Sequence, residues 1–219
     1  MKYYRYSMDM IFLNVVCSIV FVIFYIFICF WGYSSCIDLG MFVLYFLWMF
    51  LHEFLHGVGF SFAKGVLHKN IVYGAYLEKG IFYCMCKQLV RKKDIMISLA
   101  FPFFFIGVLT LFIGFIFSCQ TLIILSLFNI AGCVGDFFMF IAFLRLPSFS
   151  YIDLDDSTGF TLVSDNDLSN YKLLGFKLIR SGNYCDLTKA GNFDKFTISK
   201  LSYIVFVFMI LILIIDCFM

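Results

Sequence analysis

Long apolar runs separated by polar segments dominate the pattern of this 219-residue chain. A helix needs about 20 apolar residues to cross the hydrocarbon core of a bilayer. We predict that five runs form membrane-spanning helices: Ile11–Trp31, Met41–Ala63, Ile95–Phe117, Thr121–Leu144 and Leu201–Ile215. The pattern therefore predicts an all-α polytopic membrane protein with about five transmembrane helices.

Two polar segments between these runs predict extramembrane structure. Residues 64–94 contain the β-rich runs IVYGAYL and IFYCMC around Glu78-Lys79-Gly80, which predict a cytoplasmic β-hairpin. Residues 146–200 contain turn signals between short apolar runs and predict a small cytoplasmic β-rich or mixed module. We therefore expect a transmembrane core over residues 1–145, this module, and a C-terminal transmembrane helix within residues 201–219.

The amino-acid composition is that of a membrane protein, and the net charge bears on which partners it can have. Hydrophobic residues make up 63% of the chain and charged residues only 14%, which is outside the usage of soluble globular proteins. The lipid bilayer is thus the expected surrounding. A net charge of only +2 gives no sign of a nucleic-acid partner. The sequence does not indicate an oligomeric state.

The positions of the basic residues predict an orientation. In the five-span arrangement, all 16 lysines and arginines fall on one side of the membrane. They occur before the first span, between the second and third spans, and between the fourth and fifth spans. The positive-inside rule makes that side cytoplasmic. We therefore expect a cytoplasmic N-terminus and an external C-terminus.

The segment LHEFLHGVGF, residues 51–60, places ionisable side chains inside the second predicted span. His52 and His56 are one helical turn apart, so both imidazoles can reach one metal ion, and Glu53 can reach a water beside it. This is the HExxH pattern of zinc hydrolases, in which two imidazoles hold Zn²⁺ and the glutamate acts as general base. Ionisable groups are costly inside a membrane, which favours a functional role. The alternative is a polar helix interface without metal.

A catalytic zinc normally has a third protein ligand. The metzincin continuation would place a histidine at position 62, which is Phe62 here. His68 and Glu78 have suitable chemistry but fall on the cytoplasmic segment. Asp136 remains the strongest candidate, because Glu53 and Asp136 are the acidic residues deep within apolar spans.

In the fourth predicted span, Asp136 shares one helix face with a polar residue and a glycine. Asn129, Gly132 and Asp136 recur at i, i+3 and i+7, and we expect Gly132 and Gly135 to allow close approach of a neighbouring helix. Asn129 is a candidate for binding substrate backbone or a ligand, with plain helix packing as the alternative.

These motifs together resemble a known group of enzymes. HEFLH in one span, followed by Asn and then Asp in a later span, is similar to the site-2 protease group of intramembrane zinc metalloproteases. A closer resemblance is to small zincin peptidases formerly classed as a domain of unknown function. The features that carry it are HEFLHGVGF, FPFFF around Pro102, and NIAGCVGD followed by LRLP, within about residues 40–160.

The resemblance implies roles for individual residues. It makes His52, His56 and Asp136 zinc ligands and Glu53 the general base. Site-2 proteases usually continue from the aspartate into glycine, whereas Phe137 follows here. The implied activity is a zinc metalloendopeptidase that cleaves membrane proteins or peptides near the cytoplasmic face. Alternatives are a catalytically silent metal-binding scaffold or adaptor, and an ion or metal transporter.

Overall fold

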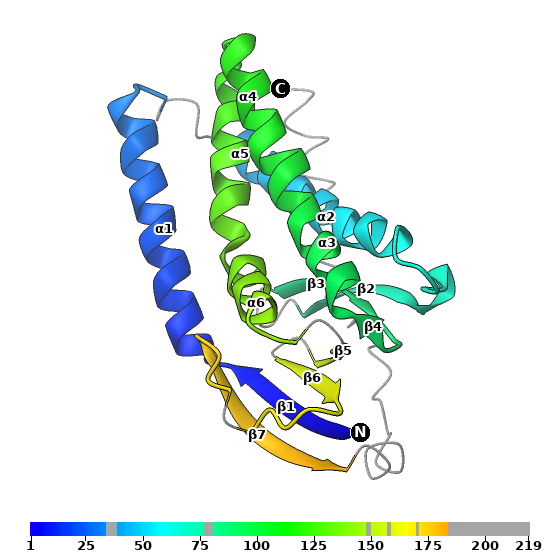
Figure 1. Ribbon diagram of the computed structural model, residues 1–219. Coiled ribbons are helices and arrows are strands. Elements are labelled where there is room, and N and C mark those ends of the chain that lie inside the picture. The colour runs from blue at the N-terminus through cyan, green and yellow to red at the C-terminus, as the bar shows by residue number, and fades with distance from the viewer. Residues whose placement is uncertain (34–38, 77–80, 148–149, 157–158, 170, 184–219) are drawn as a thin grey trace.

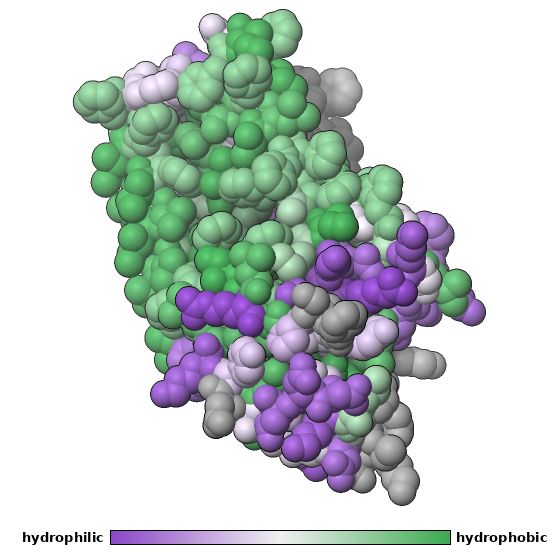
Figure 2. Space-filling model, viewed as in Figure 1, coloured by the Kyte–Doolittle hydropathy of each residue, from purple (hydrophilic) through white to green (hydrophobic). Residues whose placement is uncertain are grey.

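The computed structural model describes residues 1–33, 39–76, 81–147, 150–156, 159–169 and 171–183 (Figure 1). Apolar helices occupy one end of the described part and a β-sheet occupies the other. Hydrophilic residues gather over the sheet end in the view of Figure 2, and hydrophobic residues gather over the helices. The predicted C-terminal span, Leu201–Ile215, lies outside the described residues.

The helices follow the apolar runs of the sequence. They are α1 (Met10–Phe30), α2 (Leu39–Ser61), α3 (Lys92–Pro102), α4 (Thr110–Ile116), α5 (Gln120–Gly132) and α6 (Val134–Leu144). The π-helix η4 (Phe103–Leu109) joins α3 to α4, so Lys92–Ile116 forms one long helical segment. Within the described chain, three segments are long and apolar enough to cross a membrane: Ile11–Phe30, Leu39–Ser61 and Lys92–Ile116.

The fourth predicted span is broken in the structure. Helices α5 and α6 pass the same test of length and composition together, but they are bent by 46° at Cys133. The sequence predicted one continuous helix here. The bend separates Asn129, which lies in α5, from Asp136, which lies in the first turn of α6.

An antiparallel sheet corrects the predicted all-α class to a mixed one. Its strands, in spatial order, are β4 (Val90–Arg91), β5 (Tyr151–Asp156), β6 (Gly159–Ser164), β1 (Lys2–Met8) and β7 (Phe176–Asn183). Strand β1 was not predicted from sequence, yet it pairs with both β6 and β7. Segments from three parts of the chain therefore meet in one sheet.

Tyrosines hold β1 against the rest of the sheet. Tyr4 and Tyr6 are each 1% exposed. The Tyr6 hydroxyl donates to the backbone carbonyls of Leu168 and Tyr171, and the Tyr4 hydroxyl donates to the Asp167 carboxylate. The same core contains residues from the sheet and from the nearby helix ends: Val90, Ile95, Ala142, Phe143, Ile152, Phe160 and Leu162. This core holds α3 and the C-terminal end of α6 against the sheet.

The predicted hairpin is confirmed. Strands β2 (Ile71–Tyr76) and β3 (Ile81–Cys86) pair antiparallel, and the predicted turn residues Glu78 to Gly80 lie outside the described residues. The hairpin packs along α2. Phe82 contacts Phe46 and Phe50, with ring centroids 5.2 and 4.9 Å apart. The hairpin therefore lies beside the helix that carries HEFLH.

Helices α2 and α3 approach very closely at Gly59. A Cβ added at Gly59 would lie 2.5 Å from the Ser98 Cα atom, closer than real side chains permit. The Ser98 hydroxyl also donates to the His56 carbonyl at 2.8 Å. Glycine thus allows α3 to lie directly against the end of α2 that contains His56.

Candidate metal centre

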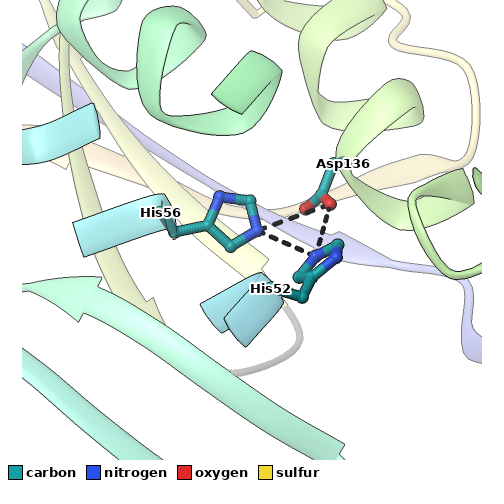
Figure 3. A group of neighbouring side chains, drawn as sticks. All are labelled: His52, His56 and Asp136. Atoms are coloured by element: carbon teal, nitrogen blue, oxygen red, sulfur yellow. Dashed lines mark hydrogen bonds and ion pairs between the residues drawn. The ribbon is translucent and has the colours of Figure 1, made fainter. Parts of the chain in front are cut away.

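His52 and His56 lie one turn apart on α2, as the sequence predicted, and their rings turn toward one another. Their Nε2 atoms are 3.1 Å apart. His56 is 5% exposed and His52 is half-buried. The two imidazoles therefore present one nitrogen each to a common point beside the helix (Figure 3).

Asp136 completes this group from α6. Its Oδ2 atom lies 3.1 Å from His52 Nε2 and 3.4 Å from His56 Nε2. Because the chain bends at Cys133, Asp136 falls in the first turn of a new helix. Backbone N–H groups at a helix N-terminus favour a negative charge there. The bend therefore both aims the carboxylate and places it where its charge is stabilised.

The three ligand atoms form a triangle that fits a zinc ion. Its sides are 3.1, 3.1 and 3.4 Å. Ligands about 2.0 to 2.1 Å from zinc in a tetrahedron lie about 3.3 to 3.4 Å from one another. Three protein ligands leave one position open, which is the arrangement of catalytic zinc sites.

The second nitrogen of each histidine is held by an acceptor. His56 Nδ1 lies 2.9 Å from the Ser98 carbonyl oxygen, and His52 Nδ1 lies 2.9 Å from Asn129 Oδ1. Each Nδ1 must carry the hydrogen to donate to these oxygens, so each Nε2 has a free lone pair. Metal-binding histidines are commonly oriented in this way.

Asn129 is itself fixed by α3. Its Nδ2 group donates to the Pro102 carbonyl at 3.3 Å, where α3 passes into the π-helix η4. This bond sets which end of the amide faces His52. Asn129 is 4% exposed, and its contacts with His52 and with the Pro102 carbonyl link α5 to both α2 and α3.

Glu53 lies on the side of α2 that faces the hairpin. Its carboxylate accepts a hydrogen bond from the backbone N–H of Cys84 on β3. Glu53 is therefore close to the two histidines without belonging to the group of three ligand atoms. This is the place a general base needs, beside the metal position and free of it.

The other sequence candidates lie elsewhere. His68 is exposed, and its Nδ1 atom is 3.5 Å from the Ser61 hydroxyl. Glu78 lies outside the described residues. The expected close approach at Gly132 and Gly135 is wrong, because added Cβ atoms there would meet no atom closer than 4.0 and 3.9 Å.

Sequence reasoning missed the contribution of Ser98. The group that contacts His56 is its backbone carbonyl, which every residue possesses, so residue type gives no signal. The tight contact at Gly59 is the feature that brings this carbonyl into reach.

Comparison with known families agrees with this geometry. A family model described as "Putative zincin peptidase" matches residues 45–151. Residues 45–151 are similar to this family. The zincin match includes both histidines, Glu53, the hairpin and Asp136, while β1, α1, β6 and β7 lie outside it. No curated protein and no solved structure matches the chain.

The zincin family implies zinc as the metal. The residues present suit it, because two neutral imidazoles and one carboxylate are a common donor set for this ion. The described chain therefore contains a group, His52, His56 and Asp136, that could hold zinc.

Proposed function

We propose that this protein is an intramembrane zinc metallopeptidase that hydrolyses peptide bonds of membrane-associated proteins or peptides near the cytoplasmic face. The observation that carries the proposal is the convergence of His52 Nε2, His56 Nε2 and Asp136 Oδ2, with both Nδ1 atoms held by acceptors. A polar helix interface without metal would not require three acceptor atoms to face one another.

The ligand residues and their partners have separate tasks. His52, His56 and Asp136 hold the ion, and Asn129 and the Ser98 carbonyl keep the two rings in place. Zinc, when bound, acts as a Lewis acid that activates water and polarises a carbonyl near neutral pH. The contacts of Asn129 support this orienting role over the direct substrate contact suggested by its sequence position.

Glu53 moves the proton. As the water oxygen bonds to the peptide carbonyl carbon, Glu53 takes the proton that the water loses. When the carbon–nitrogen bond breaks, the protonated Glu53 gives that proton to the leaving amine. Because Cys84 N–H holds the carboxylate from the hairpin side, the position of the base depends on β3.

The hairpin offers a way to hold an extended substrate. Peptidases cleave extended chains, and a strand edge can bind one through main-chain hydrogen bonds. Strands β2 and β3 lie along α2, and β3 reaches Glu53. A substrate segment aligned with this hairpin would pass close to the catalytic carboxylate.

The proposed membrane location rests on the helices. The three long apolar segments and the bent pair of α5 and α6 can enclose the site, and His56 lies eight residues from Lys64. The helical part of that spacing, His56 to Ser61, puts the metal position roughly 8 Å inside the end of α2 at about 1.5 Å per residue. The cytoplasmic assignment of that end follows from the basic residues.

The test compares substitutions that separate metal binding from proton transfer. We expect Glu53→Gln to keep about one zinc per chain and the fold, while losing turnover by 10²-fold or more, since an amide cannot accept the proton. His56→Ala should lose both zinc and turnover. Zinc is measured by elemental analysis of purified protein, and turnover by cleavage of a co-expressed membrane substrate.

The chain's other glutamate supplies the control, and Glu78→Gln should behave as wild type. Turnover by Glu53→Gln equal to that of wild type would refute the mechanism. Zinc-containing wild-type protein that cleaves no membrane substrate, and whose Glu53→Gln variant reproduces every cellular effect of the wild type, would instead indicate a metal-bound scaffold.

A further inference from the structure

Tyr73 on β2 is a polar residue beside the site that neither metal binding nor proton transfer uses. The residue is 45% exposed. Its hydroxyl end lies directly over Gly57 of α2: an added Cβ at Gly57 would be 1.8 Å from Tyr73 Oη and 2.6 Å from Cζ. Only glycine at this position leaves room for the phenol.

The contact at Gly57 puts the phenol on the same face of α2 as the catalytic base. Glu53 and Gly57 are four residues apart, so they lie one above the other on the helix. The hairpin register agrees, because Tyr73 pairs with Cys84, whose N–H contacts the Glu53 carboxylate. Cys84 therefore contacts α2 at Glu53, and Tyr73 contacts it one turn later, at Gly57. The Tyr73 hydroxyl is close enough to Glu53 for the two groups to interact electrostatically.

Peptide hydrolysis requires a hydrogen-bond donor for the carbonyl oxygen, and a hydroxyl can supply one. When water adds to the peptide carbonyl, the carbonyl oxygen gains a negative charge, and a fixed donor aimed at it lowers the barrier. The Nδ1–H groups of both histidines already donate to Asn129 and Ser98. The phenol O–H of Tyr73 is a donor that lies beside the base, and it belongs to a residue that is partly exposed.

We propose that Tyr73 is a catalytic residue whose hydroxyl donates a hydrogen bond to the peptide carbonyl oxygen as it becomes negative. The inference rests on the proposed peptidase function. The phenol keeps its proton throughout: the proton lost by water goes to Glu53 and then to the leaving amine. Gly57, which has no side chain, leaves the space that the Tyr73 ring occupies.

The principal variant is Tyr73→Phe, which keeps the ring and removes the donor. With purified full-length protein and a peptide that the wild type cleaves, we expect kcat to fall about 10²-fold, with KM and zinc content unchanged. Tyr171→Phe is the control, since Tyr171 is a similarly exposed residue (40%) that lies far from α2 in sequence, next to β7. It should retain wild-type kcat.

Binding of a transition-state mimic gives a readout that does not depend on turnover. A phosphinic analogue of the cleaved peptide carries a tetrahedral, negatively charged group in place of the amide. Tyr73→Phe should weaken its binding by about the same factor as kcat. Binding of the matching uncleavable amide analogue should not change.

Gly57→Ala tests independently whether the position of the Tyr73 ring matters. The added methyl must displace the ring, so kcat should fall as in Tyr73→Phe, and the double variant should be no worse than the lower single variant. Turnover and phosphinate binding by Tyr73→Phe within about threefold of wild type would overturn the inference alone. Wild-type protein that cleaves no peptide would overturn the proposed function, and this inference with it.

Discussion

At the scale of single residues, the candidate site depends on which nitrogen of each histidine carries hydrogen. The Ser98 carbonyl can only accept, so it fixes His56 with hydrogen on Nδ1. Asn129 could present either end of its amide, and the bond from its Nδ2 group to the Pro102 carbonyl selects the oxygen for His52. A change at Asn129 should therefore act on the metal through His52.

We expect Asn129→Leu, which has similar volume and no acceptor, to lower zinc affinity about 10- to 100-fold, the usual effect of losing an orienting partner. Asn129→Asp keeps an acceptor for His52 Nδ1 and should recover most of that affinity. The measurement is competition for zinc with a chromophoric chelator. Equal zinc affinity in Asn129→Leu and wild type would show that zinc binding by His52 does not depend on the hydrogen bond to Asn129.

At the scale of helices and strands, local sequence spacing predicted part of the site. The pair His52 and His56 could be predicted because both lie on one regular helix with a known repeat. The arrangement of Asn129 and Asp136 could not, because it depends on the bend at Cys133. Gly132 and Gly135 flank that position, but glycines also occur in the unbroken helix α2, so they do not by themselves predict a bend. The two residues meet His52 across the bend instead of along one face.

Strand β1 was missed for a related reason. KYYRYSM is short, and its pairing partners lie more than 150 residues away in β6 and β7. Strand preference depends strongly on such distant neighbours, which a local pattern does not contain. The hairpin of β2 and β3 was predictable because both strands and the turn between them are adjacent in sequence.

The contact between α2 and α3 gives a prediction at this scale. In Gly59→Ala, the methyl group would meet the Ser98 backbone, so α3 must move away from α2. We expect a loss of about 1 to 3 kcal/mol in stability from overpacking, together with weaker zinc binding as the Ser98 carbonyl leaves His56. Thermal unfolding and chelator competition measure the two effects.

Gly132→Ala is the matched control, since its methyl would meet only Tyr45 Oη, at 4.0 Å. Alanine there should be neutral or slightly stabilising, because it favours helix over glycine. Equal unfolding temperatures for Gly59→Ala and Gly132→Ala would contradict the importance of close α2–α3 packing.

At the scale of the whole molecule, the sheet restricts how the chain can cross a membrane. Strands β1, β4 and β5 belong to one sheet, so the segments that carry them lie on one side. Helices α1 and α2 lead from β1 to β4, and the segment Lys92–Ile116 then leads away from the sheet. We infer that α5 and α6 together form the returning span, because β5 follows them and lies beside β4. This gives four crossings before β5.

Protease accessibility tests this arrangement on the unaltered chain. Trypsin cleaves after lysine and arginine, and exposed sites occur on both sides of the Lys92–Leu144 region, among them Lys64 and Lys177. In sealed vesicles with the cytoplasmic face outward, we expect cleavage at both sites, and in vesicles of the opposite orientation neither site should be cut until detergent is added. Cleavage of both sites only from the opposite face would reverse the predicted orientation and leave the four crossings intact. Cleavage of Lys64 and Lys177 from different faces would mean that α5 and α6 enter and leave on the same side, and it would refute the crossing pattern that the sheet requires.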